Sequence, residues 1–291
     1  MAQNNLFDEL NKLQREIDKI ADKTMRQIAR EYANALEETR TIIRKRYDKY
    51  ANKDGELTYE EMTKYTRKKK LDAELAAAVK TTHVQASKLT RQMLRQTYKN
   101  SFTSTQKFIE SAAERVIRGQ VKNEVIQEAL QMPVSGLTLN DRLERRRRYI
   151  IGRIRESVGQ GLYQGETYSS MSKRLKETLE GDVEKAERIV RTESHRVMEK
   201  SKYDSVEHAV NQGVDMLKYW MTSSDERVRT QHISMGEKYK EENAIPVDQN
   251  FVNQDTGGRG PTPGQLGTAE DDINCRCIAG YVVNTGEEKN V

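Results

Sequence analysis

The stretch LFDELNKLQREIDKIADKTMRQI, residues 6–28, decides the fold of this chain. Its apolar residues recur at alternating steps of about three and four, so they form one seam along an α-helix. The seam consists of Leu6, Leu10, Leu13, Ile17, Ile20 with Ala21, Met25 and Ile28. Such a seam packs against another helix, either in a hairpin within the chain or in a coiled coil with a second chain. We expect the hairpin and keep the coiled coil as the alternative.

Helix-breaking residues are nearly absent around this stretch. The first proline is Pro133, and only Gly55 and Gly119 precede it. Because glycine and proline are the residues that interrupt helices most strongly, their scarcity permits very long helices. We therefore predict a first helix over about residues 5–51 and a second that continues to about Arg118.

The two long helices are separated by a turn at residues 52–55. After it, Thr58 and Glu61 have the spacing of a capping box, in which the hydroxyl and the carboxylate satisfy exposed amides at a helix start. Residues 50–61 also have the glycine and glutamate spacing of a calcium loop. Its first position is Tyr50, which offers no carboxylate, so we interpret the segment as a hairpin turn.

The rest of the chain changes from helical to mixed composition. Further helices are predicted at 120–131, 140–161, 168–179 and 182–213. From about Lys218 glycine and proline become frequent and short β-type runs appear. The predicted fold class is mainly α: a long helical hairpin and a helical middle region, followed by a small α+β carboxy-terminal domain. The predicted divisions are a long-helical region 1–135, a helical middle region 136–217, an α+β domain 218–284 and a disordered tail 285–291.

Composition indicates a thin core. The 291 residues allow about two domains, but only 35% are hydrophobic and mean hydropathy is −0.90. We expect an elongated molecule, or one that completes its core against partner chains. No run approaches the roughly 18 apolar residues of a membrane span, and the chain does not begin like a secretory leader, so we expect no membrane partner. Cys275 and Cys277 are too close in sequence to staple a fold.

Charge is unevenly distributed along the chain. Residues 1–200 carry 41 Lys and Arg against 30 Asp and Glu, a net +11, whereas residues 201–291 carry a net −6. A basic body favours contact with nucleic acid or an acidic protein surface. The densest basic run is Arg145, Arg146, Arg147 and Arg148. Adjacent residues point all round a helix, so this run is either a solvated, salt-bridged face or a contact for phosphate or an acidic partner.

One group of residues has the chemistry of a metal site. His232 precedes Asn274-Cys275-Arg276-Cys277, and two thiols on one face of a strand together with an imidazole suit zinc. Asp225, Asp271 or a water could supply the fourth ligand. The alternatives are two buried thiols with a hydrogen-bonded histidine, or reactive cysteine chemistry. The cysteine spacing is shorter than in common zinc sites, and we expect no bound metal, with zinc as the alternative. His83, His195 and His208 lie in charged helices and are interpreted as surface or partly packed residues.

Signatures of the common enzyme classes are missing. The chain has no nucleotide-binding P-loop, no G-x-S-x-G elbow and no H-E-x-x-H motif. Arg191-Thr192-Glu193 lies in a predicted helix and is interpreted as a salt-bridging face. We expect no enzymatic activity and no catalytic residue. The alternative is a metal-dependent hydrolase or nuclease using Asp225, His232, Cys275 and Cys277.

Taken in order, several weak motifs resemble one family. They are Gly161-Leu162-Tyr163-Gln164-Gly165, Lys173-Arg174-Leu175, Arg191-Thr192-Glu193, Trp220, the run from Asp225 through Arg227, Val228 and Arg229 to His232, Phe251 before a Pro-Gly loop, and Asn274-Cys275-Arg276-Cys277. This series resembles the phage Mu F-like minor head proteins, also called phage head morphogenesis proteins, over about residues 137–283. Some members carry C-x-x-C where this chain has Arg229 and His232, and because Arg229 is no metal ligand, a full four-ligand site is in doubt.

The resemblance implies a minor capsid protein of a phage or prophage. It would be located in the virion, in the capsid interior near the portal, and in the host cytoplasm during assembly. Its expected partners are the portal protein, other capsid or scaffolding proteins, weakly and non-specifically bound DNA, and further copies of itself. A plain DNA-binding protein is the remaining alternative. We also expect Asp225, Arg227, Arg229, Asn274 and Arg276 to form a structural cluster around His232 and the two cysteines.

Overall fold

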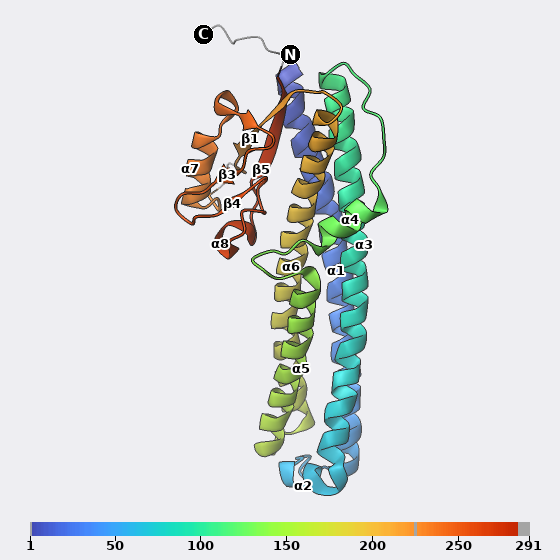
Figure 1. Ribbon diagram of the computed structural model, residues 1–291. Coiled ribbons are helices and arrows are strands. Elements are labelled where there is room, and N and C mark those ends of the chain that lie inside the picture. The colour runs from blue at the N-terminus through green and yellow to red at the C-terminus, as the bar shows by residue number, and fades with distance from the viewer. Residues whose placement is uncertain (1, 224–225, 285–291) are drawn as a thin grey trace. The chain divides into compact units, whose positions relative to one another are not determined.

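The computed structural model describes residues 2–223 and 226–284, and it confirms a mainly α fold with a small carboxy-terminal sheet (Figure 1). The longer helices are α1 (Ala2–Tyr50), α3 (Arg67–Ala112), α4 (Asn123–Gln131), α5 (Leu139–Tyr163), α6 (Tyr168–Val210) and α7 (Thr230–Lys238). The short ones are α2 (Tyr59–Thr63), η1 (Lys64–Thr66), η2 (Glu241–Asn243) and α8 (Ala269–Asp272). The strands are β1 (Met216–Met221), β2 (Ile245–Pro246), β3 (Phe251–Val252), β4 (Arg259–Gly260) and β5 (Ile278–Val283). Among the described residues, no helix is both long and apolar enough to cross a membrane.

The chain forms two compact units that are each built from separate stretches of sequence. Unit 1 contains Met1–Asp22, Arg91–Leu139 and Val190–Val291, and unit 2 contains Lys23–Thr90 and Asn140–Ile189. Helices α1, α3 and α6 therefore contribute to both units. The predicted divisions at 135, 217 and 284 cut the chain into consecutive segments, whereas each unit combines segments that are distant in sequence. The predicted tail 285–291 lies outside the described residues.

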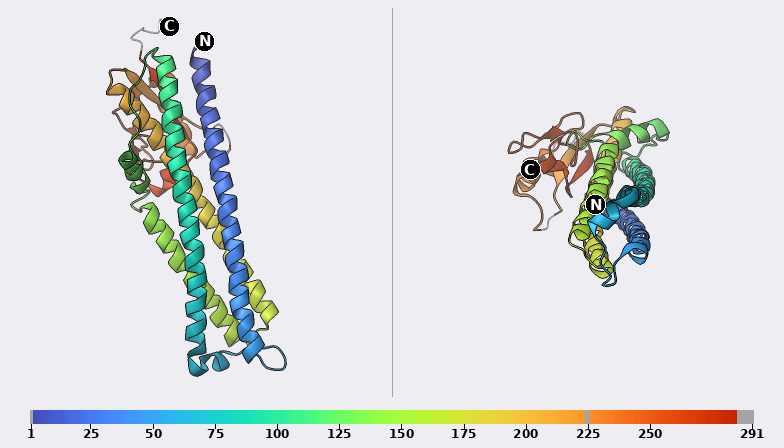
Figure 2. Two further views of the ribbon diagram at one scale, coloured as in Figure 1. Left: turned by 90° about the vertical axis from the view of Figure 1, so that its right-hand side faces the viewer. Right: turned by 90° about the horizontal axis from the view of Figure 1, so that it is seen from below.

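Unit 2 is a bundle of helices. Figures 1 and 2 show the parts of α1, α3, α5 and α6 that belong to this unit running side by side. Its buried apolar side chains include Met25, Ile28, Ile43, Leu71, Leu75, Ile154, Leu162, Met171 and Leu175. Polar contacts join the helices as well: the Tyr47 hydroxyl donates to the Glu166 carbonyl at 2.8 Å, and Arg46 pairs with Glu74 at 2.5 Å.

The turn after α1 forms as the sequence predicts. The side-chain oxygen of Asn52 accepts hydrogen bonds from the amides of Asp54 and Glu56 at 3.0 and 2.9 Å, which closes the turn. Thr58 then caps α2, since its hydroxyl accepts from the amide of Glu61 at 3.3 Å. The Glu61 carboxylate instead pairs with Lys64 and Arg67, so only half of the predicted capping box forms.

Three predicted helix boundaries are wrong. The second long helix is not continuous from Thr58 to Arg118: it breaks at η1 and ends at Ala112. The break places Tyr65 and Thr66 in the left-handed region, at φ 51° and 60°, although neither is glycine. The helices predicted at 168–179 and 182–213 are one helix, α6, because a single Gly181 costs a helix only about 1 kcal/mol. Finally, the helix predicted from residue 120 begins at Asn123.

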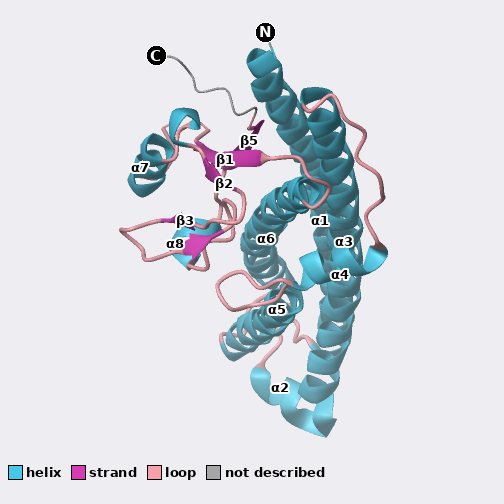
Figure 3. Ribbon diagram, turned by 45° about the horizontal axis from the view of Figure 1, so that its top comes forward, coloured by secondary structure: helices cyan, strands magenta, loops and turns pink. Residues whose placement is uncertain are grey.

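Unit 1 contains the small α+β part of the chain. An antiparallel sheet has the strand order β2-β1-β5, with Trp220 of β1 opposite Ala279 of β5, and β3 pairs with β4 (Figure 3). Trp220 and Phe251 belong to its core, with ring centroids 5.3 Å apart. The core also receives Ile109 from α3 and Val206 from α6, so the sheet is stabilised by the ends of the long helices.

Where side chains are described, the predicted apolar seam is buried except for Ile20, which is partly buried. In unit 1, Leu10, Leu13 and Ile17 pack with Met198 of α6 and Ile278 of β5. The seam of this unit therefore contacts α6 and the sheet of the same chain.

Two buried ion pairs lie along α6 in unit 1. Glu193 pairs with Arg196 and Glu199 pairs with Lys202, each at 2.8 Å, and all four side chains are at most 2% exposed. The second pair also holds β5: Lys202 Nζ donates to the Ala279 carbonyl, and Glu199 accepts from the Ala279 amide, both at 2.8 Å. Because β5 is an edge strand, this ion pair takes the place of a neighbouring strand at Ala279.

Candidate metal centre

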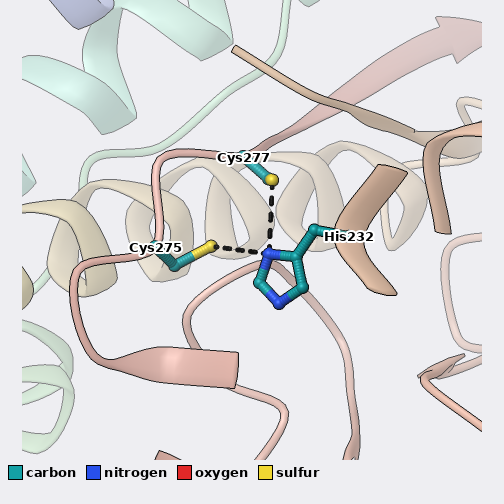
Figure 4. Close-up of side chains that lie close together, drawn as sticks. All are labelled: His232, Cys275 and Cys277. Atoms are coloured by element: carbon teal, nitrogen blue, oxygen red, sulfur yellow. Dashed lines mark hydrogen bonds between the residues drawn. The ribbon is translucent and has the colours of Figure 1, made fainter. Parts of the chain in front are cut away.

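His232, Cys275 and Cys277 meet inside unit 1. The imidazole Nδ1 lies 3.7 Å from the Cys275 Sγ and 3.4 Å from the Cys277 Sγ, and all three residues are buried. Figure 4 shows both sulfur atoms directed at this ring nitrogen, with His232 coming from α7. The expectation that both cysteines lie on a strand is wrong, because they precede β5. Their side chains still point the same way, since the exposed Arg276 alternates with the two buried cysteines.

A carboxylate fixes the orientation of the histidine. His232 Nε2 lies 3.2 Å from the Asp271 carboxylate, which assigns the ring proton to Nε2 and leaves Nδ1 free to face the sulfur atoms. Asp271 is held in turn by Asn253 at 2.7 Å and by Thr256 and Thr268 at 2.6 Å. These hydrogen bonds keep the pKa of Asp271 below its usual value despite burial. The arrangement matches the carboxylate that usually supports a metal-binding histidine.

The two thiols differ in acidity because one hydrogen-bonds to the other. The hydrogen bond with Cys277, together with burial, raises the pKa of Cys275 to about 11. The same hydrogen bond lowers the pKa of Cys277, with smaller contributions from Trp220 and Arg229. Burial alone would lower the pKa of His232, but hydrogen bonds with Cys275 and Asp271 raise it. In the metal-free protein, hydrogen bonds therefore join His232 to Asp271 and to the two cysteines.

His195 is a fourth member that the sequence did not reveal. It lies on α6 and is 6% exposed, so its interpretation as a surface or partly packed residue is wrong. It hydrogen-bonds with Cys275, and its Nε2 has no partner among the described residues. The ring also packs against the loop at Gly264, where an added Cβ would lie 3.2 Å from the imidazole. A histidine in a charge-rich helix carries no sequence signal for such burial.

A cavity reaches this cluster. Its volume is about 530 Å³, and both Cys275 and His195 line it. The predicted structural residues Arg227, Arg229, Asn274 and Arg276 line the same cavity. Asp225, also predicted for this cluster, lies outside the described residues.

Backbone groups hold several of these side chains in place. Arg229 donates to the carbonyl of Asp271 at 3.4 Å and to that of Ile273. The Asn274 amide donates to the Thr192 hydroxyl at 3.2 Å, which ties the cysteine segment to α6. Glu193, beside Thr192, is buried in its pair with Arg196, so the predicted salt-bridging role of this segment fits the structure.

The geometry passes a simple test for zinc. Zinc binds sulfur at about 2.3 Å and nitrogen at about 2.0–2.1 Å, so tetrahedral coordination requires neighbouring sulfur and nitrogen ligands about 3.6 Å apart. The two observed nitrogen–sulfur separations are 3.7 and 3.4 Å. All three ligand atoms lie within 4.8 Å of one another. Two thiols and an imidazole, with His195 available beside Cys275, form a donor set that zinc prefers.

The predicted arginine contact lies in unit 2, on α5. Arg146 pairs with Asp182, and Arg147 pairs with Glu144 at 2.8 Å. Arg145 and Arg148 are exposed. Half of the run is therefore salt-bridged, and contact of the run with DNA or a partner stays a prediction.

Comparisons with known proteins cover most of the chain. Residues 152–279 match the family described as "Phage Mu protein F like protein". "Minor head protein GP7" of Bacillus phage SPP1 is 32% identical over 276 residues, which are 93% of this chain and 87% of that protein. "NAD(+)--arginine ADP-ribosyltransferase EFV" of Enterococcus faecalis is 27% identical over 164 residues, which are 56% of this chain and 32% of that protein. No solved structure matches the chain significantly.

Proposed function

This chain belongs to the phage Mu F-like family of minor head proteins, and we propose that it binds the portal vertex during head assembly or genome delivery. Membership makes it a phage head protein with a role in head morphogenesis and a place in the virion. The observation that carries the proposal is the extent of the similarity to a minor head protein. It covers 93% of the chain and so includes the long helices as well as the cluster of His232, Cys275 and Cys277.

The buried cluster supports an assembly role over catalysis. His232 and Cys277 are 1% and 2% exposed, and the cavity of about 530 Å³ is lined by Cys275 and His195 but not by these two. The nuclease alternative also needs Asp225, which lies outside the described residues. The ADP-ribosyltransferase match covers 32% of that protein, so the activity in its name is not transferred to this chain.

We further propose that the cluster holds a structural zinc ion, in place of the metal-free state expected from sequence. Cys275, Cys277 and His232 would be its ligands, because their ligand atoms lie within 4.8 Å of one another, and His195 hydrogen-bonds with Cys275. Bound zinc would supply a cross-link between α7 and the segment before β5. Such a cross-link stabilises a small domain whose own apolar core is limited.

We propose DNA as a secondary partner. Other capsid or scaffolding proteins, and further copies of this chain, remain predicted partners. The net charge of +11 on residues 1–200 supports weak, sequence-independent attraction to phosphates. Exposed Arg145 and Arg148 are candidate contacts.

Co-purification tests the portal proposal. The full chain, with an affinity tag, is co-expressed with the untagged portal protein of the same phage, and the eluate is analysed for both. We expect the portal protein to elute with the chain and to be absent when the tagged chain is omitted. A portal ring that assembles normally but never elutes with the chain would contradict the proposal.

A further inference from the structure

Three exposed tyrosines gather at one end of unit 2. Tyr65 and Tyr163 are 83% and 81% exposed, and Tyr59 is 40% exposed. They come from different segments: Tyr59 begins α2, Tyr65 lies in η1 and Tyr163 ends α5. Figure 1 shows α2 beside the end of α5 in this unit, and the rings of Tyr59 and Tyr163 lie 5.7 Å apart. Single exposed aromatic rings are ordinary, whereas exposed rings that gather in one place can mark a site of protein interaction.

The backbone that presents Tyr65 is strained. Tyr65 has φ 51° and ψ 33°, and Thr66 has φ 60°, so two consecutive non-glycine residues are left-handed. Side-chain-bearing residues adopt this conformation at an energetic cost, and such strain is concentrated at functional sites. Here the strain breaks a helix and leaves the tyrosine ring largely in solvent, at 83% exposure.

An arginine fixes the ring from one side. The guanidinium of Arg67 lies 5.2 Å from the centre of the Tyr65 ring and 4.0 Å from that of Tyr50. Arg67 also pairs with Glu61. The Tyr65 ring is thus positioned before any partner arrives, which reduces the entropy lost on binding.

Two hollows, which share no lining residue, and three cations lie at the same end of unit 2. One hollow, of about 550 Å³, is lined by Tyr59, Lys69 and Arg155 among others, and one of about 300 Å³ is lined by Tyr65 and Lys70 among others. Lys69, Lys70 and Arg155 are exposed, and no ion pair is found for them among the described residues. We call the three tyrosines and these three cations the tyrosine patch.

The composition of the patch favours a protein partner over nucleic acid. Tyrosine and arginine are the residues that most often dominate protein interfaces. Part of the neighbouring positive charge is offset by two carboxylates, since Lys64 and Arg67 share Glu61 and Lys68 pairs with Asp72. The remaining free cations are few for holding a phosphate backbone but complement carboxylates on a protein surface.

We propose that the tyrosine patch is the surface through which this chain binds the portal protein, at a portal face that carries carboxylates. The inference rests on the proposed function, which supplies the partner. The rings of Tyr65 and Tyr163 are the anchors, and Lys69, Lys70 and Arg155 set the orientation.

The test measures the affinity of the purified full chain for the portal ring. The decisive variant is Tyr65→Gly, because glycine accepts the left-handed backbone, so the protein should melt at or above the wild-type temperature while losing the anchor. We expect at least tenfold weaker binding for Tyr65→Gly and for Tyr163→Ala. A Lys69→Glu/Lys70→Glu variant should bind more weakly, most clearly at low salt. The control is Tyr149→Ala, an exposed tyrosine of α5 that is about 20 Å along the helix from Tyr163.

The outcomes separate this inference from the proposed function. No binding of the wild-type chain to the portal ring contradicts the proposed function itself. Wild-type binding that Tyr65→Gly and Tyr163→Ala leave unchanged overturns the patch alone. In a third outcome, the variants keep portal binding but lose binding to a DNA oligonucleotide or lose self-association in sedimentation. That outcome would assign the patch to the other partner and overturn the inference.

Discussion

Replacing Lys202 with methionine should destabilise unit 1 far more than a typical lysine substitution. Methionine keeps much of the side-chain length but removes both hydrogen bonds of the ammonium group, to Glu199 and to the Ala279 carbonyl, each 2.8 Å long. Glu199 is 0% exposed and would be left buried without a cationic partner. Breaking a buried ion pair in this way costs about 3–5 kcal/mol of unfolding free energy. That is a large part of the roughly 5–15 kcal/mol that stabilises a typical protein.

The fluorescence of Trp220 provides the assay. It is the single tryptophan of the chain, is 2% exposed and lies beside β5, so its emission reports unfolding of unit 1. Urea unfolding of the full chain would give the free-energy difference. Lys12→Met is the matched control, because Lys12 and Glu9 form an ion pair in the same unit at 3.9 Å with both side chains more than half exposed. It should cost less than about 0.5 kcal/mol.

A double variant tests the reasoning itself. In Glu199→Gln/Lys202→Met the uncompensated charge is gone, and the glutamine oxygen can still accept from the Ala279 amide. The double variant should therefore be more stable than Lys202→Met alone. A Lys202→Met cost below about 1 kcal/mol, or a double variant that is less stable than the single one, would refute the role assigned to the pair.

Three other predictions concern metal, pH and DNA. Elemental analysis of the untagged chain should find one zinc per chain. The His232→Ala and Cys275→Ser variants should lose the zinc and melt at lower temperature, while the control His83→Ala keeps it. A zinc-free protein whose variants melt normally would contradict the zinc proposal and reduce the cluster to a set of hydrogen bonds. Burial lowers the pKa of Lys218 from 10.5 to about 8, so between these pH values the unfolded chain binds more protons than the folded one. The unfolding free energy should therefore rise by up to about 3 kcal/mol from pH 8 to 10.5, relative to the Lys218→Met variant. Equal pH profiles of the two proteins would contradict this. Duplex DNA should bind weakly and lose affinity steeply from about 50 to 200 mM salt in mobility shifts, whereas salt-independent binding, or none at low salt, would argue against a phosphate contact.

The sequence by itself determined the features that depend on local chemistry. The scarcity of glycine and proline before Pro133 predicted the long helices. The seam from Leu10 to Ile28 is buried as its spacing requires, with Ile20 partly buried. The turn at Asn52 and the cap at Thr58 were also predictable, because side chains within a few residues satisfy their backbone groups. The convergence of His232 with the two cysteines followed from residue chemistry.

The tertiary structure alone decided the features that depend on distant contacts. No residue at 64–66 is a helix breaker, so the break there could not be read from local propensity, and Gly181 is a weak enough breaker for α6 to continue through it. The roles of His195 and Asp271 likewise depend on contacts with Cys275 and His232, which are distant in sequence. A charged residue on a helix looks the same in sequence whether it faces water or a strand edge. Burial of the Lys202 ion pair is therefore fixed only when β5 packs against α6, because Ala279 then supplies the backbone groups that make a buried charge tolerable.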